Sequence, residues 1–217
     1  MALDVPISAA MAIRIQSRPP RAADGRQRRS ERSRDAIVQA LYELTRQGEL
    51  EPTAQQVAAR ARVGIRSVFR HFADMDSLYA ELGAQVRAEV VPLMQAEFRG
   101  TASERARDLV ARRAQVFEVI GPHKRAAGLA RRRSLFLQRQ HVAMVRELRA
   151  ALLRALPELA TAPAELVEAL DLVLSFEAWD RLRSDQRLSR ERAAAVVERT
   201  VQTLVSEILR KRRGRTR

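Results

Sequence analysis

The residues best suited to contact another molecule lie between positions 53 and 72, where the sequence contains several cations and not one acid. These cations are Arg60, Arg62, Arg66, Arg70 and His71. A guanidinium group binds phosphate oxygens, and its planar fork can also form two hydrogen bonds with the major-groove edge of a guanine. Contacts of this kind need a rigid support, so the elements that carry these side chains decide what the segment can do.

The same segment has the pattern of two short helices joined by a turn. Thr53 can cap the first helix, and Gln56 completes a capping box three residues later. A cationic second helix in such a pair is typical of a helix-turn-helix that places this helix in the DNA major groove. The alternative is an ordinary helical hairpin with a solvated basic face. The apolar positions at helical spacing are Val57, Ala58 and Ala61, then Val63, Val68, Phe69 and Phe72.

The flanking residues extend this pair to a three-helix unit with a fourth helix behind it. Ser30 or Ser33 can start the first helix, and Gly48 can end it as a glycine cap. Asp74 can cap the fourth helix, which we expect to run to about Pro92. The apolar face of the first helix consists of Ile37, Leu41 and Leu44.

Residues 30 to 82 resemble the TetR family of one-component bacterial transcriptional regulators, because order and spacing agree across four helices. The resemblance implies an N-terminal DNA-binding domain followed by a helical domain that binds a small molecule and dimerises. The matching positions are Thr53, Val57, Ala58, Ala61, Val63, Ser67, Val68, Phe69, Phe72, Asp74, Asp76 and Leu78.

The resemblance also implies roles for individual residues. Ile65 and Arg66 would read base edges, Ile65 through a thymine methyl group and Arg66 through a guanine. A purely electrostatic grip on phosphates is the alternative for Arg66 and the preferred role for Arg70. Arg62, Gly64 and Phe69 replace a turn glycine, a capping serine and a tyrosine that are common in relatives, and all three stay among the DNA-binding candidates. The implied phosphate contacts come from Thr53, the Gly64 backbone N–H, Ser67, Arg70 and His71.

Beyond residue 95, proline and glycine divide the chain into segments that fit helices, so we expect an all-α fold with about nine helices. Residues 1–29 are expected to form a disordered basic arm, 30–92 the DNA-binding domain, 93–209 the ligand-binding and dimerisation domain, and 210–217 a basic tail. These two ends carry most of the formal net charge of +14. We expect the first arm to contact phosphates or the minor groove, and a solvated tail is the alternative for both ends.

Two C-terminal helices, 163–184 and one starting at Ser189, are apolar on more than one face and therefore need cover on more than one side. We expect the second cover to come from the same helices of another subunit, in a two-fold homodimer. The alternative is that both helices are interior to one subunit. The predicted interface consists of Leu166, Leu170, Val173, Leu174, Val197, Val201, Leu204, Val205 and Ile208.

By the same resemblance, the second domain would enclose an effector of unknown identity. An aromatic or Met residue at helical spacing is often plain core, which is the alternative for each candidate. The candidate pocket residues are Phe98, Phe117, His123, Phe136, His141, Met144, Phe176 and Trp179.

The sequence argues against catalysis, metal binding and membrane insertion. It has no cysteine, and its three histidines lack metal-ligand spacing. Asp171, Glu177 and Asp180 lie at helical spacing, and we expect them to be interfacial hydrogen-bonding groups or salt-bridge partners of Arg181 and Arg183. No catalytic residue, metal or cofactor is therefore expected, and the N-terminal apolar stretch is too short for a membrane span, which indicates a cytoplasmic protein.

The function expected from these observations is a regulator that binds a palindromic double-stranded DNA operator as a dimer. Repression with release by a small molecule is the mode that the resemblance favours. The alternative is an architectural protein that binds DNA without sequence preference.

Overall fold

The computed structural model describes residues 22–214 of the chain, and every regular element in that range is a helix. The all-α prediction is confirmed. Expectations for residues 1–21 and 215–217 lie outside the described residues. None of the described helices is both long enough and apolar enough to span a bilayer.

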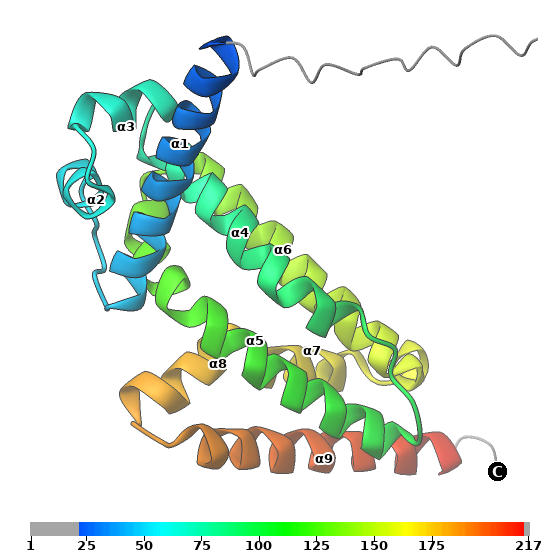
Figure 1. Cartoon of the computed structure of the whole chain (residues 1–217). Helices are drawn as coiled ribbons and strands as arrows, with labels where there is room; N and C mark the ends of the chain where they lie inside the picture. The colour runs from blue at the N-terminus through cyan, green and yellow to red at the C-terminus, as the bar shows by residue number, and fades with distance from the viewer. Residues whose placement is uncertain (1–21, 215–217) are drawn as a thin grey trace, which may run out of the picture.

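Three helices, α1 (Ala22–Arg46), α2 (Ala54–Ala61) and α3 (Ile65–His71), form one end of the molecule (Figure 1). The predicted capping box is present, with the Gln56 N–H donating to Thr53 Oγ1 at 3.2 Å. Gly48 ends the turn after α1 with a φ of +94°, as its position predicted. Helix α1 begins at Ala22 and not at Ser30 or Ser33, so residues 22–29 are helical and not part of an arm.

The apolar faces of these three helices meet in a small core. Ile37 and Leu41 of α1 are fully buried, as are Val57 of α2 and, nearly, Val68 of α3. Phe72, just after α3, is also buried and lies under the guanidinium of Arg34, 5.1 Å from the ring centre. The burial of Val68 and Phe72 fixes which side of α3 faces outward.

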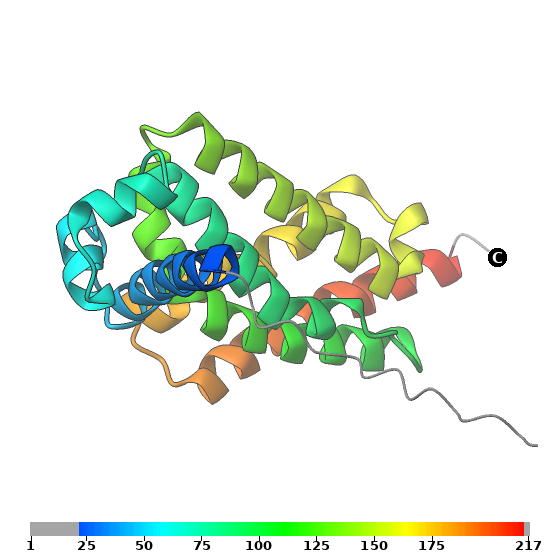
Figure 2. The same cartoon turned by 45° about the horizontal axis from the view of Figure 1, so that its top comes forward.

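Helices α4 (Met75–Gln95), α5 (Ala102–Arg131) and α6 (Leu135–Ala155) pack side by side between the α1–α3 end and the C-terminal helices (Figures 1 and 2). The Asp74 cap of α4 is confirmed, and Thr101 caps α5. Pro92, where the fourth helix was expected to end, lies inside α4, and Pro122 lies inside α5. Helix α5 continues through Pro122 because the residues around it, such as Phe117 and His123, are held in the core.

The C-terminal region contains the short 3₁₀ helix η1 (Pro157–Thr161), α7 (Ala164–Val173), α8 (Phe176–Asp180), the π-helical turn η2 (Arg181–Asp185) and α9 (Arg190–Gly214). The single helix expected over 163–184 is therefore divided. It stops at Leu174 because Ser175 caps a new helix, with its Oγ accepting from the Ala178 N–H at 3.1 Å. Helix α9 extends past residue 209, so residues 210–214 continue it and do not begin a separate tail.

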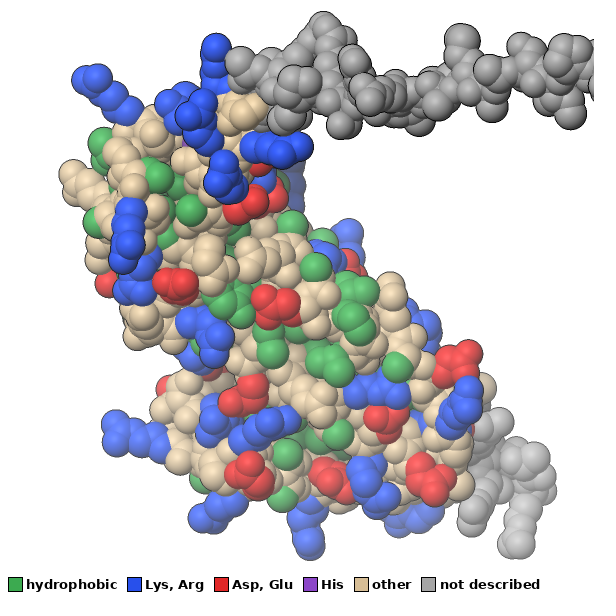
Figure 3. Space-filling view, viewed as in Figure 1, with side chains coloured by type: hydrophobic (Ala, Val, Ile, Leu, Met, Phe, Trp, Pro, Cys, Tyr) green, Lys and Arg blue, Asp and Glu red, His purple; other side chains and the backbone are tan. Residues whose placement is uncertain are grey.

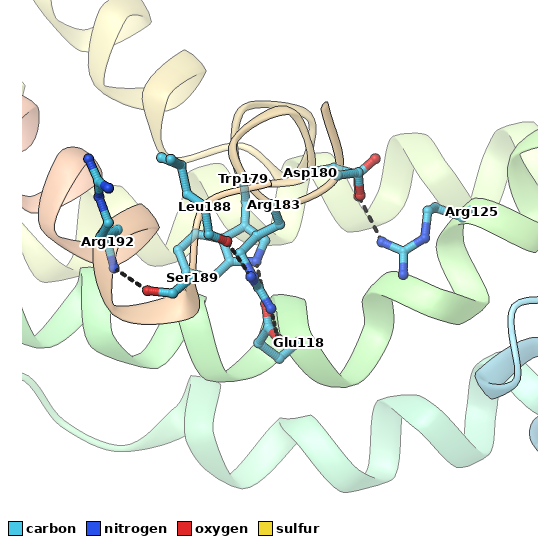
Figure 4. A network of polar contacts seen from close by, with 9 residues as sticks. Glu118, Arg125, Trp179, Asp180, Arg183, Leu188, Ser189 and Arg192 are labelled. Carbon is cyan, nitrogen blue, oxygen red and sulfur yellow. Dashed lines mark hydrogen bonds and ion pairs between the residues drawn. The ribbon is translucent and has the colours of Figure 1, made fainter. Parts of the chain in front are cut away.

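A polar network holds α8 and η2 against α5 (Figure 4). Glu118 of α5 accepts from Trp179 Nε1 at 3.0 Å and from Arg183 Nε at 2.8 Å. Asp171, Glu177 and Asp180 do not pair with Arg181 and Arg183 as predicted. Their cationic partners come from α5 and α6 instead. The observed pairs are Arg125–Asp180 at 2.8 Å, Lys124–Glu177 at 3.4 Å and Arg149–Asp171 at 3.1 Å.

Arg113 of α5 lies at the centre of the C-terminal core with only 2% of its surface exposed. Its guanidinium donates to two backbone carbonyls, Leu148 O of α6 at 2.5 Å and Leu174 O at the end of α7. Burial lowers the pKa of Arg113 to about 10, so the side chain remains charged at neutral pH. A single side chain thus fixes α6 and α7 on α5 through backbone carbonyl dipoles rather than through a carboxylate, and its Nε is buried with no hydrogen-bond partner among the described residues.

We expect Arg113→Lys to destabilise the protein by about 2–4 kcal/mol, because an ammonium group keeps the buried charge but cannot hold both carbonyls in the same way. Arg113→Met fills similar volume and removes the charge together with its donors, so it should cost less than Arg113→Lys. Urea unfolding followed by circular dichroism gives both free energies. A methionine variant less stable than the lysine variant would contradict this account of the buried charge.

Candidate nucleic-acid interface and internal pocket

The outward face of α3 combines apolar and cationic side chains. Ile65 is 39% exposed and Phe69 51%. Arg66 and Arg70 are exposed beside them, and no side chain in the described part of the sequence pairs with Arg66. Arg70 donates to Ser67 Oγ at 3.3 Å. The four side chains form a surface that can meet both methyl groups and anionic or polar edges.

Basic side chains gather around this end of the molecule, whereas acidic and basic groups alternate over the rest of the face shown in Figure 3. Helix α1 adds the exposed side chains of Arg26, Arg29 and Arg32. Arg34 is different, because its guanidinium forms a two-bonded fork with Glu81 of α4 at 3.0 and 2.7 Å. This fork lowers the pKa of Glu81. It makes Arg34 a structural residue and not part of a phosphate-binding arm.

The turn between α2 and α3 contains a residue in an unfavourable backbone conformation. Arg62 ends α2 with φ of 56° and ψ of 41°, the left-handed region that glycine adopts freely and other residues rarely enter. Gly64, which precedes α3, has an ordinary φ of −71° and provides no side-chain cap. The glycine of this turn therefore lies two residues away from the position that needs it.

Two of the predicted phosphate-contacting residues are partly engaged inside the protein. Thr53 is exposed, but its hydroxyl is already used within the chain. Thr53 Oγ1 accepts from the Gln56 N–H and donates to Gln56 Oε1 at 2.9 Å. His71 is half-buried, and its Nε2 is buried with no hydrogen-bond partner among residues 22–214. Burial and the nearby Arg70 and Arg34 lower the pKa of His71, so its ring is neutral at pH 7. Any contact from His71 would therefore come from a neutral ring.

A cavity of about 420 Å³ lies between α4, α5 and α6. It contains three of the eight predicted pocket residues, His123, His141 and Met144. One apolar wall comes from α4, with Tyr79, Leu82, Val86, Val90 and Met94, and α5 and α6 form the others.

The α4 residues of this wall were not among the residues predicted to line a pocket. The available signal was that α4 continues with Val86, Val90 and Val91 well beyond the part that packs on α1. Apolar residues that the DNA-binding unit does not need indicate a second buried surface.

The other five predicted pocket residues lie elsewhere. Phe117, Phe176 and Trp179 pack together as plain core, with ring centres 5.7 and 6.4 Å apart. Phe98 lies under the guanidinium of Arg112, 4.3 Å from the ring centre, and Phe136 is 41% exposed on α6.

Two polar side chains mark different walls of the cavity. His123 Nδ1 lies 2.7 Å from Thr45 Oγ1 of α1, and the His123 ring packs on Tyr42 with ring centres 4.6 Å apart. Lys124 Nζ lies 3.4 Å from His141 Nδ1 and above the ring of Phe176. The cavity is thus in direct contact with the DNA-binding unit through His123.

The predicted dimer interface is mostly interior to the single chain. Seven of its nine residues are buried, and Val173 and Leu204 are half-buried, because α9 packs along α5 and α7. Val201 is fully buried and Val205 only 4% exposed. The apolar residues that these helices leave outside are Leu172, at 71% exposure, and Val196, at 45%.

Comparison with solved structures shows the same fold in bacterial transcriptional regulators. A transcriptional regulator from Rhodococcus sp. Rha1 superposes with a TM-score of 0.59 at 20% identity, over 84% of this chain and 96% of that one. A protein from Mesorhizobium loti MAFF303099 described as a TetR-family transcriptional regulator gives 0.55 at 18% identity, over 83% and 96%. The multidrug-binding protein EbrR, complexed with imidazole, gives 0.50 at 24% identity, over 85% and 95%. No family model and no curated protein matches the sequence.

We expect Arg62→Gly to raise the free energy of unfolding by up to about 1 kcal/mol, because glycine adopts the left-handed conformation without strain. Part of the gain is offset, because glycine also raises the conformational entropy of the unfolded chain. Arg187→Gly is the matched control, since Arg187 has a φ of +53° in the connection before α9. Both gains are measurable by urea unfolding. If Arg62 contacts a phosphate, only Arg62→Gly should also lower the slope of log affinity for duplex DNA against log salt. Equal DNA binding by both variants would show that Arg62 has no such contact.

Proposed function

We propose that this protein is a DNA-binding transcriptional regulator that responds to a small molecule. The observation that carries the proposal is the exposed face of α3, where Ile65, Arg66, Phe69 and Arg70 stand on the second helix of a helix-turn-helix. The shared fold of the Rhodococcus and Mesorhizobium regulators supports the proposal. Helix α3 would enter the major groove, and phosphate contacts would fix its register.

The DNA contact proposed for each α3 side chain follows from its surroundings. Arg66 has no partner in the described part of the chain and is free to form two hydrogen bonds with a guanine. Arg70 contacts Ser67 and lies at the last turn of the helix, where a phosphate contact is more suitable. Ile65 and Phe69 offer apolar contact to thymine methyl groups and sugars.

The small-molecule site of this proposal is the cavity between α4, α5 and α6. One of its walls is α4, which also holds the DNA-binding unit through Leu78 and the Glu81–Arg34 fork. A ligand that enlarges the cavity would therefore shift α4 relative to α1–α3 and weaken operator binding, in the mode of a repressor that its effector releases. This coupling requires that the ligand bind the two arrangements with unequal affinity.

An architectural protein that binds DNA without sequence preference is the second candidate. An unpaired arginine flanked by exposed apolar side chains favours sequence reading, because phosphate binding alone needs only cations. The cavity favours the regulator as well, since packaging DNA requires no internal ligand site.

The active species of the proposal is a homodimer on a palindromic operator, because one α3 covers only half a site. The second subunit would contact the outer sides of α7 and α9, where Leu172 and Val196 are exposed. This revises the interface set expected from the sequence, most of which α5 and its neighbours already cover.

Selection of fragments from random-sequence duplex DNA tests the function directly. The wild-type protein should enrich one short palindrome. Arg66→Ala should weaken binding to it by about 1–3 kcal/mol and relax base preference at one position in each half-site. Arg70→Ala should weaken all duplexes about equally. Enrichment of no common sequence by the wild type would favour the architectural protein, and an unchanged preference in Arg66→Ala would move base reading to other residues.

We expect Leu172→Glu or Val196→Glu to shift the protein from dimer to monomer, because each places charges of like sign at a two-fold contact while leaving the fold intact. Val142→Glu, on the exposed side of α6, is the matched control and should remain dimeric. Val201→Glu should instead unfold the chain, since that side chain is interior. Sedimentation velocity and circular dichroism distinguish the three outcomes. Dissociation by Val142→Glu alone would place the interface on α6.

A further inference from the structure

The cavity between α4, α5 and α6 has more positive than negative charge in its lining. Its cations come from all three helices, whereas the one acid among its lining residues, Glu147, is already held by Arg87. Arg87 Nη1 lies 2.6 and 2.7 Å from the two Glu147 carboxylate oxygens. This pair cancels, which leaves Lys124, Arg131 and Arg154 without a counterion from the described lining. A ligand therefore meets a net positive potential, which attracts an anion.

Lys124 is poorly neutralised by the protein, although only 15% of its side chain is exposed. Its ammonium lies 3.4 Å from Glu177 Oε1 of α8 and 3.4 Å from His141 Nδ1 of α6. Both distances are longer than a well-formed hydrogen bond. Burial lowers the pKa of Lys124 and of His141, and the charge of Arg131 lowers both further, although Glu177 acts in the opposite direction. The cluster thus lacks a negative group that would balance it.

Gly128 leaves open space between the two α5 cations. Lys124, Gly128 and Arg131 follow one another at intervals of one helical turn, and all three line the cavity. A Cβ added at Gly128 would meet no atom within 4 Å, so the packing of the chain does not require a glycine there. Glycine inside a helix costs stability relative to alanine. A ligand group between the two cations supplies the reason for the space that the packing does not.

The rest of the cavity suits an apolar body. Its volume of about 420 Å³ lies in the range that holds small organic ligands. Glu177, beside Lys124, would repel a group with several negative charges, so the site favours a single one. The apolar lining residues include Val86, Val90, Ile120, Met144 and Leu148.

We infer that the cavity binds an apolar molecule with a single carboxylate, and that this carboxylate lies in front of Gly128, between Lys124 and Arg131. The inference rests on the proposed function, because it names the effector class for the same cavity. The same end of α5 contacts α1 through His123 and Thr45. The carboxylate would therefore bind where the cavity meets the DNA-binding unit.

The test compares carboxylates with neutral alcohols of nearly the same shape, 2-naphthoate with 2-naphthalenemethanol and octanoate with octan-1-ol. Calorimetry on the full-length protein without DNA, at neutral pH, gives the ratio of the two affinities in each pair. The wild type should bind at least one carboxylate about tenfold more tightly than its alcohol, because only the carboxylate forms charge-assisted hydrogen bonds with the two cations.

Lys124→Met and Arg131→Met should each reduce this ratio several-fold. Arg139→Met is the matched control, because it also removes one positive charge but lies on the exposed side of α6, outside the lining. It should keep the wild-type ratio. An equal ratio in all three variants would overturn the inference and leave the cations a role only at the end of α5. A wild type that binds neither carboxylate, or binds each no more tightly than its alcohol, would also overturn it.

Gly128→Leu tests the position of the carboxylate while both cations remain. Leucine favours the helix more than glycine does, so the melting temperature should not fall. Its side chain fills the space in front of the cations, and carboxylate affinity should drop at least about tenfold. Unchanged affinity in this variant would place the carboxylate elsewhere and overturn the assignment.

The selection of DNA fragments separates this inference from the proposed function. A wild type that shows the carboxylate preference but enriches no DNA sequence would refute the proposed function and leave the carboxylate site intact. A wild type that enriches a palindrome but does not prefer carboxylates would refute the inference alone.

Discussion

Helix α4 has to satisfy two apolar environments with one set of side chains. Its first turns bury Leu78 against α1–α3, and Tyr79, Leu82, Val86 and Val90 form a wall of the cavity. Polar contacts at two positions fix how α4 is rotated about its own axis and where it lies along that axis. Ser134, at the start of α6, donates to Asp76 at 2.5 Å, while Glu81 holds Arg34 of α1.

These contacts leave α4 little freedom to adjust to only one of its neighbours. Closely packed interiors transmit small displacements instead of absorbing them. A change of cavity volume therefore cannot stay local and must alter the contact between α4 and α1 or between α4 and α6. The rest of the proposed mechanism depends on this shared use of one helix.

The N-terminal half of the fold could be predicted from sequence because its signals are local. The Thr53–Gln56 capping box, the Asp74 cap and the Gly48 turn each depend on residues within one or two helical turns, and all three are present. The surface of α3 followed from the same local pattern. The C-terminal half was less predictable because its decisive contacts join distant residues. Arg113 of α5 donates a hydrogen bond to the carbonyl of Leu174, and no local pattern in residues 163–184 predicts that contact.

The predicted pocket and interface show the same limit in another form. Aromatic residues were predicted to line the pocket, yet Phe117, Phe176 and Trp179 pack in the core. A helix that is apolar on more than one face can be covered by its own chain as well as by a second subunit, and periodicity alone does not distinguish the two. The packing of α9 on α5 and α7 shows that Val197, Val201 and Val205 are covered by their own chain.

Pro122 gives α5 uneven mechanical compliance along its length. The part of α5 before Pro122 is held by α9 and by the Arg113 and Glu118 contacts. The part after it is held by other partners, Thr45 of α1 through His123 and α8 through Lys124 and Arg125. Proline lacks the N–H that would complete the helix ladder at this point, so a bend costs less here than in an uninterrupted helix. The weakened turn thus lies between two separately anchored segments, and a displacement of α1 or α8 can reach the end of α5 without moving its beginning.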